Sequence, residues 1–126
     1  MTPKFRAWLK EEYRMTDVRE MTFIDGEVYL ISDVTGFYAY EEFKLMQSTG
    51  VEDKNGKEIF EGDIVKYKGG WNTFTEEVAY DKNFGGFGVM DADADIIFTF
   101  EELFADIDLS SLEVIGNIYE NPELLE

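Results

Sequence analysis

Two acidic stretches of the chain contain residue types that can bind a divalent cation. In the first, VEDKNGKEIFEG, Gly56 stands where the calcium loop of an EF-hand needs its glycine, with Asp53 and Asn55 at the third and fifth positions. The first and twelfth positions hold Val51 and Gly62, which have no side-chain oxygen. We therefore interpret Asn55-Gly56 as a turn that leads into a strand, because this dipeptide is typical of tight hairpins.

The second acidic stretch, DADADIIFTFEE, fits the ligand spacing better. Oxygen-bearing residues occupy positions one, three, five and twelve of the loop, namely Asp91, Asp93, Asp95 and Glu102. The sixth position holds Ile96, however, and a β-branched residue adopts the required backbone conformation only at a cost. We expect a solvated loop that its like charges keep extended, and we leave open whether this loop binds a cation.

The composition removes most catalytic chemistries. The chain of 126 residues has no histidine and no cysteine, which excludes Ser-His and Cys-His nucleophiles, disulfides and zinc sites that use these side chains. Carboxylate pairs remain, but with 28 acidic residues such pairs arise by chance. We therefore expect a protein that is not an enzyme and has no catalytic residue, cofactor or metal.

The net charge of −17 is unevenly distributed. Residues 1–19 hold five basic and three acidic residues, a net charge of +2, which leaves −19 for the rest, and no basic residue follows Lys82. Such a surface repels DNA, RNA and anionic membranes, so a basic protein is the more plausible partner. The alternative, which we favour, is that the charge simply keeps a small domain soluble. No apolar run has the length of a membrane-spanning helix or a signal peptide, and we expect a cytoplasmic protein.

The hydrophobic pattern indicates a mainly β protein with one or two short helices. Asp25-Gly26, between two β-rich runs, predicts a type I′ hairpin, and Gly85-Gly86 predicts a second turn. Further strands are expected at 4–9, 59–69, 76–90 and 112–121, where Gly116 permits a bend. Residues 38–47 stay undecided, because their aromatic start favours a strand whereas Phe43 and Met46 have helical spacing. Turn formers in 48–58 suggest a boundary between an N-terminal β region, 1–50, and a second domain, 51–126.

One helix has clear start signals. Thr99 can cap its first turn, Glu102 completes a capping box, and Phe98 and Leu103 stand at the positions of a hydrophobic staple. At the end of the chain, Asn121 precedes a proline and predicts the cap of a short final turn.

Four aromatic residues stand near glycines in expected loops: Trp71, Phe74, Phe84 and Phe87. Loop-borne rings of this kind can form a shallow platform for a peptide or a stacked ring. The alternative, which we favour, is that the rings cover the ends of a barrel or fill a subunit contact, because a small domain needs such apolar area.

The stretches MQSTGVEDKNGKEIFEGDIVKY and LEVIGNIYENPELLE resemble the YopX family of phage and prophage proteins, and the resemblance runs from KFRAW near the start to the last residue. It implies an N-terminal β region followed by an SH3-like small barrel, and self-association into a homo-oligomer. It implies no activity and offers no catalytic residue.

These observations together predict a non-enzymatic, self-associating accessory protein of phage type that binds another protein, in the cytoplasm of a bacterial host. The partner would be a second copy or a basic host or phage protein. The alternative is an acidic decoy that mimics nucleic acid and occupies a host DNA-binding protein. Because a +2 segment can dock on a −19 body, we also expect Lys4, Arg6 and Trp8 to contribute to a subunit contact.

Overall fold

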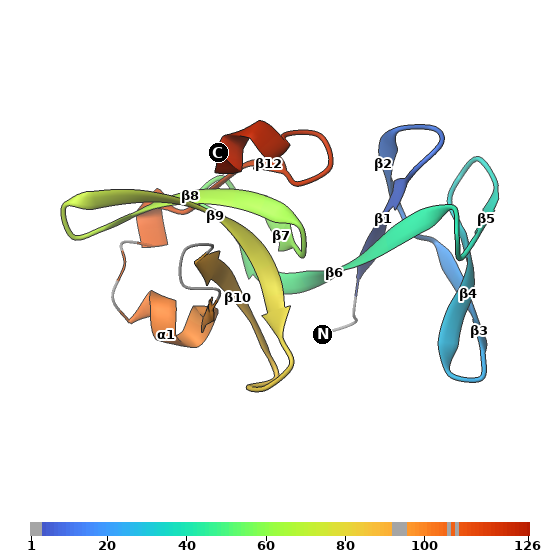
Figure 1. Ribbon diagram of the computed structural model, residues 1–126, viewed down its shortest axis with the longest axis horizontal. Helices are drawn as coiled ribbons and strands as arrows, with labels where there is room; N and C mark the ends of the chain where they lie inside the picture. The colour runs from blue at the N-terminus through green and yellow to red at the C-terminus, as the bar shows by residue number, and fades with distance from the viewer. Residues whose placement is uncertain (1–3, 92–95, 106, 108) are drawn as a thin grey trace. The chain divides into compact units, whose positions relative to one another are not determined.

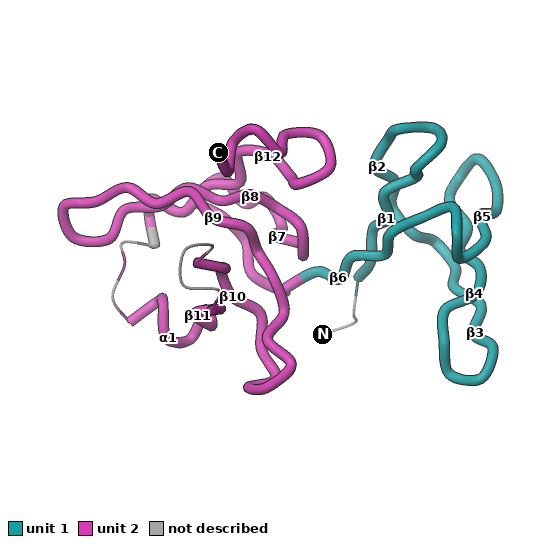
Figure 2. The backbone as a smooth tube through the Cα atoms, viewed as in Figure 1, with its two compact units in different colours: residues 1–48 teal, residues 49–126 magenta. Residues whose placement is uncertain are grey.

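The computed structural model describes residues 4–91, 96–105, 107 and 109–126. The chain forms two compact units, residues 1–48 and residues 49–126 (Figure 2), whereas the sequence analysis placed the boundary between residues 50 and 51. The chain passes from unit 1 to unit 2 inside one strand, β6 (Phe43–Glu52). This strand pairs with β1 in unit 1 and with β7 in unit 2, so no linker separates the units.

Unit 1 consists of short antiparallel strands (Figure 1). In chain order they are β1 (Phe5–Leu9), β2 (Arg14–Asp17), β3 (Glu20–Ile24), β4 (Glu27–Ser32), β5 (Phe37–Ala39) and the first part of β6. Strand β1 lies between β2 and β6, and β4 lies between β3 and β5. The buried core of unit 1 contains Ala7, Leu9, Ile31 and Phe43.

The undecided segment 38–47 contains the end of β5, a turn at residues 40–42 and the start of β6. Phe43 and Leu45 pack with the core of unit 1, and Met46 lies on the opposite face of the strand because successive side chains alternate. The helical spacing of Phe43 and Met46 therefore reflects two buried faces of one strand.

The predicted hairpin at Asp25-Gly26 is confirmed. Asp25 has φ 52° and Gly26 has φ 82°, and these two residues join β3 to β4. A type I′ turn requires positive φ at both central positions, which explains why this dipeptide stands here.

Unit 2 is built on an antiparallel sheet that curls on itself (Figure 1). Its elements are β7 (Glu58–Phe60), β8 (Asp63–Gly69), β9 (Asn72–Asp81), β10 (Gly86–Asp91), β11 (Ile96–Thr99), α1 (Phe100–Phe104), the 3₁₀ turn η1 (Leu109–Ser111), β12 (Glu113–Asn117) and a second 3₁₀ turn, η2 (Pro122–Leu125). The order of strands in the sheet is β11-β10-β9-β8-β12. The mainly β prediction is confirmed, and the SH3-like identity of the barrel stays a prediction.

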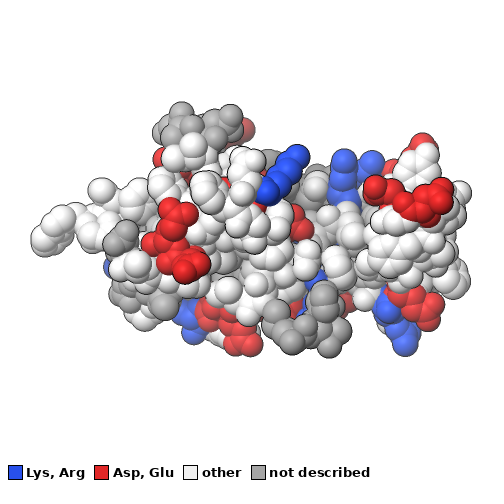
Figure 3. All heavy atoms as spheres, turned by 90° about the horizontal axis from the view of Figure 1, so that it is seen from below, with Lys and Arg blue, Asp and Glu red and all other residues white. Residues whose placement is uncertain are grey.

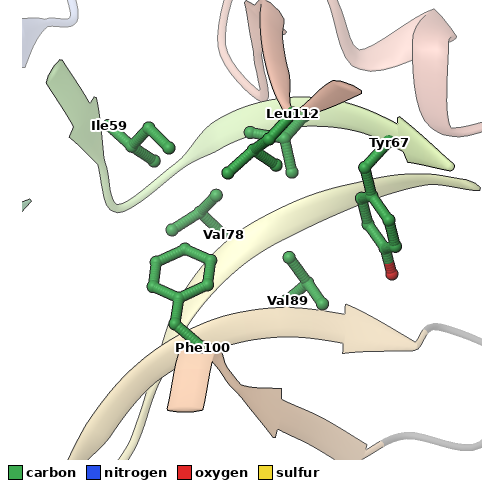
Figure 4. Packing of buried hydrophobic residues seen from close by; sticks show 7 residues of the cluster. Ile59, Tyr67, Val78, Val89, Phe100 and Leu112 are labelled. Atoms are coloured by element: carbon green, nitrogen blue, oxygen red, sulfur yellow. The ribbon is translucent and has the colours of Figure 1, made fainter. Parts of the chain in front are cut away.

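The core of unit 2 is formed by side chains from the sheet, from β7, from α1 and from the segment between η1 and β12 (Figure 4). Its buried members are Ile59, Val65, Tyr67, Val78, Val89, Phe100 and Leu112. Two glycines shape the sheet around this core. A Cβ atom on Gly88 would stand 2.0 Å from the carbonyl oxygen of Phe98, and the register of β12 shifts between Val114 and Gly116, where a bend was expected.

The capped helix is also confirmed, with a difference in detail. The amide of Glu102 donates to the Thr99 hydroxyl at 3.4 Å, and this hydroxyl donates to the Glu102 carboxylate at 3.0 Å, whereas a capping box uses the backbone N–H of the cap. The predicted final turn is confirmed, with Asn121 at its cap position and Pro122 directly after it, but the capping hydrogen bond is not formed. Asn121 makes no side-chain bond to η2 and instead accepts a bond from the amide of Asn117 at 3.2 Å. Among the described residues, no helix has the length and apolar character to cross a membrane.

Candidate functional site

The first acidic stretch is a turn, as predicted. Asp53, which is 8% exposed, follows β6, and one of its carboxylate oxygens accepts bonds from the amides of Asn55 and Lys57, each at 2.9 Å. The other oxygen accepts a bond from the amide of Val114 at 2.9 Å. Gly56, with φ 79°, closes the turn through a bond from its amide to the carbonyl of Asp53.

These bonds determine the electrostatic state of Asp53. Burial raises the pKa of a carboxyl group, but the three backbone N–H donors outweigh it and hold the pKa of Asp53 below its usual value. Both oxygens are thus engaged by the fold. Within residues 4–91, 96–105, 107 and 109–126, no three acidic side chains are grouped to hold a metal ion, and Asp93 and Asp95 of the second stretch lie outside the described residues.

The three residues proposed for a subunit contact lie at the start of unit 1. Lys4 is exposed, whereas Arg6 and Trp8 are only 8% and 5% exposed, and the Trp8 ring contacts Tyr13 edge-on at 4.9 Å. Because β1 is paired on both sides, residues 5–9 are part of a sheet and not a free arm. Of the three, Lys4 is the one that the fold leaves open to solvent.

The four loop aromatics do not form one platform. Trp71 is fully exposed beyond the end of β8, and Phe84, 79% exposed, lies between β9 and β10. The ten-residue strand β9 separates them, a length of roughly 30 Å. Phe87 contacts the Tyr80 ring at 5.1 Å and packs on the core, and Phe74 stacks on Tyr67 at 5.3 Å.

Phe74 instead lines a cavity of about 510 Å³ in unit 2, which we call the acidic pocket. Strands β8 to β11, helix α1 and Ile107 beyond its end supply the walls: Tyr67, Gly69, Phe74, Glu76, Asp91, Phe98, Glu102, Leu103 and Ile107. The register of β8 against β9 places Tyr67 opposite Phe74, and the hairpin of β10 and β11 leads into the helix that brings Glu102 and Leu103 to the pocket. The staple residues of α1 are thus also pocket residues.

The carboxyl group of Glu76 is half-buried in the acidic pocket. Burial, with the nearby Asp91 carboxylate, raises the pKa of Glu76 above its ordinary value, although the hydrogen bond that Glu76 accepts from the Tyr67 hydroxyl acts in the opposite direction. Burial, together with the bond to Glu76, also raises the pKa of Tyr67. The described wall therefore carries three carboxylates beside three aromatic rings, and it includes no basic side chain.

Sequence reasoning found the pocket residues singly but not as a group. Asp91 and Glu102 were considered as ligands of a cation loop, Phe74 as part of a platform, and Phe98 as a staple. Glu76 was missed, although it stands in phase with the buried Val78 on β9, and an acid in the core-facing phase of a strand is a signal for a polar pocket.

The chain was compared with known proteins. The model of the YopX family, described as YopX protein, matches residues 4–126. The crystal structure of protein EF1440 from Enterococcus faecalis is similar, with 33% sequence identity and a TM-score of 0.72, and the match covers 100% of this chain and 99% of that chain. No curated protein matches the chain. Because the family model matches nearly the whole length, the chain belongs to the YopX family.

Proposed function

We propose that this chain is a non-enzymatic, self-associating accessory protein of phage or prophage type, and that its second unit binds a basic segment of another protein. The observation that carries the proposal is the acidic pocket, where carboxylates and aromatic rings line a cavity of about 510 Å³. A cavity of this size is within the range of roughly 300–1,000 Å³ that ligand sites occupy.

The chemistry of the acidic pocket fits a lysine or arginine side chain. A cation on an aromatic face gains from the electron-rich ring, which Phe74 and Phe98 would supply. Glu76 and Asp91 would accept charge-assisted hydrogen bonds from the same group. Unit 2 as a whole has 19 acidic and five basic residues, so its field draws cations toward the site.

The absence of histidine and cysteine from the sequence supports a role in binding over one in catalysis. The distribution of charge favours a pocket over a mimic of nucleic acid. On the face shown in Figure 3, the carboxylates form separate groups with Lys and Arg side chains among them, whereas a decoy needs carboxylates laid out like phosphates along a strand.

Self-association is supported by exposed rings in unit 1. Tyr29, Phe37 and Tyr40, on or next to β4 and β5, are 45%, 68% and 54% exposed, and the rings of Tyr29 and Tyr40 lie 5.7 Å apart. Exposed aromatic rings are enriched at protein interfaces, and the neighbouring rings of Tyr29 and Tyr40 place two of them side by side.

The pocket proposal is tested by titrating the protein with a short arginine peptide and with the same peptide carrying neutral citrulline. We expect binding of the arginine peptide only, and Glu76→Gln should weaken it about fivefold, since a partly exposed charge pair contributes up to about 1 kcal/mol. Glu102→Gln should weaken binding as well. Glu101→Gln is the matched control, because Glu101 lies on the same helix and does not line the pocket.

Equal binding of the citrulline peptide would show that the acidic pocket does not recognise a cation. Equal losses in the Glu101 and Glu102 variants would show that net charge and not the pocket governs binding. Equal losses in these two variants would favour the decoy if, in addition, the chain binds a host DNA-binding protein and duplex DNA competes with that binding.

A further inference from the structure

Unit 2 has a second cavity of different chemistry, which we call the lysine pocket. It has a volume of about 390 Å³ and is lined by Lys54, Lys66, Tyr67, Lys68, Thr73, Ser110, Ser111 and Glu113. The lysines come from the turn after β6 and from β8, and the serines come from η1. Only Tyr67 also lines the acidic pocket.

The position of these lysines is unusual for so acidic a unit. Unit 2 has five basic residues against 19 acidic ones, and three of the five line this one cavity. With Glu113 as the one carboxylate among the described lining residues, the wall carries a local charge of +2 inside a unit of net charge −14. Carboxylates are abundant in the rest of unit 2, whereas ammonium groups are concentrated at this cavity. An anion is therefore favoured locally in the lysine pocket.

The remaining polar groups suit an oxygen-rich anion. Hydroxyl groups of Thr73, Ser110 and Ser111 lie on the same wall, and hydroxyl and ammonium groups are the donors that oxyanions accept. The amide of Lys68 donates to the Ser111 hydroxyl oxygen at 2.9 Å, which ties η1 to β8 and holds this wall together.

Glu113 is a carboxylate that already occupies part of the positive field. Its oxygen lies 3.6 Å from the Lys54 ammonium nitrogen and accepts a bond from the Asn55 amide group at 3.3 Å. Both Lys54 and Glu113 are more than a third exposed, so this ion pair is weak and an incoming anion can compete for Lys54.

We infer that the lysine pocket binds a small oxyanion of the phosphate class. The ligand is a small anion and not a nucleic acid, because a polymer would extend its other phosphates over a unit of net charge −14, beyond the reach of three lysines. This inference is independent of the cation site in the acidic pocket.

The test is a titration with inorganic phosphate at constant ionic strength, followed by the backbone amide signals of Lys68 and Ser111. We expect saturable shifts of both signals. The double variant Lys66→Gln/Lys68→Gln should weaken binding about tenfold, and Glu113→Gln should strengthen it about twofold to fivefold, since it removes the competing carboxylate. Lys57→Gln/Lys82→Gln is the matched control, because it also removes two charges of unit 2, both outside the pocket lining.

A parallel titration with glycerol 3-phosphate distinguishes free phosphate from a phosphate ester, and tighter binding of either assigns the natural source. Thermal unfolding of each variant confirms that it is folded. The inference is overturned if phosphate leaves both amide signals unmoved, if Lys66→Gln/Lys68→Gln binds as the natural chain does, or if Lys57→Gln/Lys82→Gln weakens binding as much as Lys66→Gln/Lys68→Gln.

Discussion

Buried aspartates in this protein organise turns. Asp33, Asp53, Asp63 and Asp81 are all at most 9% exposed, and each accepts a hydrogen bond from a nearby backbone amide. Asp33 shows the extreme case, since it also accepts bonds from the hydroxyls of Thr16 and Thr35 and from Arg14, which together hold its pKa far below the usual value despite burial. Such carboxylates stabilise the fold and are not available for a ligand.

Asp53 is the aspartate whose role decides between a turn and a metal site. We predict that Asp53→Ala lowers the free energy of unfolding by about 2–3 kcal/mol, because the amides of Asn55, Lys57 and Val114 lose a charged acceptor. Urea denaturation measures the change. Glu52→Ala, at an exposed neighbouring position, is the control and should cost less than about 0.5 kcal/mol.

The difference in free energy of unfolding between the natural chain and Asp53→Ala should depend on pH. The pKa of Asp53 is lower in the folded chain than in the unfolded chain, so its contribution is complete above about pH 4 and is lost as the pH falls through the folded pKa. The difference in free energy of unfolding between the natural chain and Asp53→Ala should therefore become smaller at acidic pH. If this difference does not change with pH, Asp53 does not stabilise the turn as a charged acceptor. If calcium stabilises the natural chain but not Asp53→Ala, Asp53 is a metal ligand.

At the scale of elements, the contact between β10 and β11 determines whether the acidic pocket exists. Gly88 lies opposite Thr99, next to the start of α1, and the backbone of β11 fills the space in which a side chain at residue 88 would stand. Strands β10 and β11 can therefore pair closely only with glycine at residue 88. This pairing places α1, and with it Glu102 and Leu103, at the wall of the acidic pocket.

We predict that Gly88→Ala destabilises the protein by about 2–3 kcal/mol, because a Cβ 2.0 Å from the Phe98 carbonyl oxygen forces the strands apart. Gly86→Ala in the same strand is the matched control, since its Cβ would meet its nearest atom, of Thr99, at 3.6 Å, an ordinary contact. Thermal unfolding compares the two variants. Similar melting temperatures would mean that β11 is not held against β10 in solution.

Local signals in the sequence predicted the elements that local chemistry determines. Asp25-Gly26, Asn55-Gly56 and the cap at Thr99 each specify a conformation through the residues themselves. Both pockets escaped prediction, since they depend on the register of β8 against β9 and on the return of α1 and η1 to the sheet. The start of strand β6 was not predicted as a strand, because side chains on both of its faces are buried. The alternation of apolar and polar residues that identifies a strand is therefore missing.

At the scale of the whole molecule, self-association is the property with the most direct test. We predict that the natural chain sediments as an oligomer and that Phe37→Glu shifts it toward the monomer, because a charge is costly to bury in an apolar contact. Phe84→Glu, at a similarly exposed ring in unit 2, is the control.

Lys4→Glu tests the charged contact at the start of unit 1 and leaves strand β1, which lies between β2 and β6, in place. A natural chain that sediments as a monomer at high concentration would contradict self-association. If the oligomer is unchanged in Phe37→Glu, Phe37 is not part of the subunit contact.

The passage of the chain through β6 has a consequence for anyone who wishes to work with one half of the protein. A gene fragment that starts at residue 49 begins in mid-strand, and one that ends at residue 48 stops there. Either fragment keeps only part of β6, the strand that pairs with β1 in unit 1 and with β7 in unit 2, so each half would have to hold its sheet with a shortened strand. The two halves are best expressed, mutated and exchanged as a single piece.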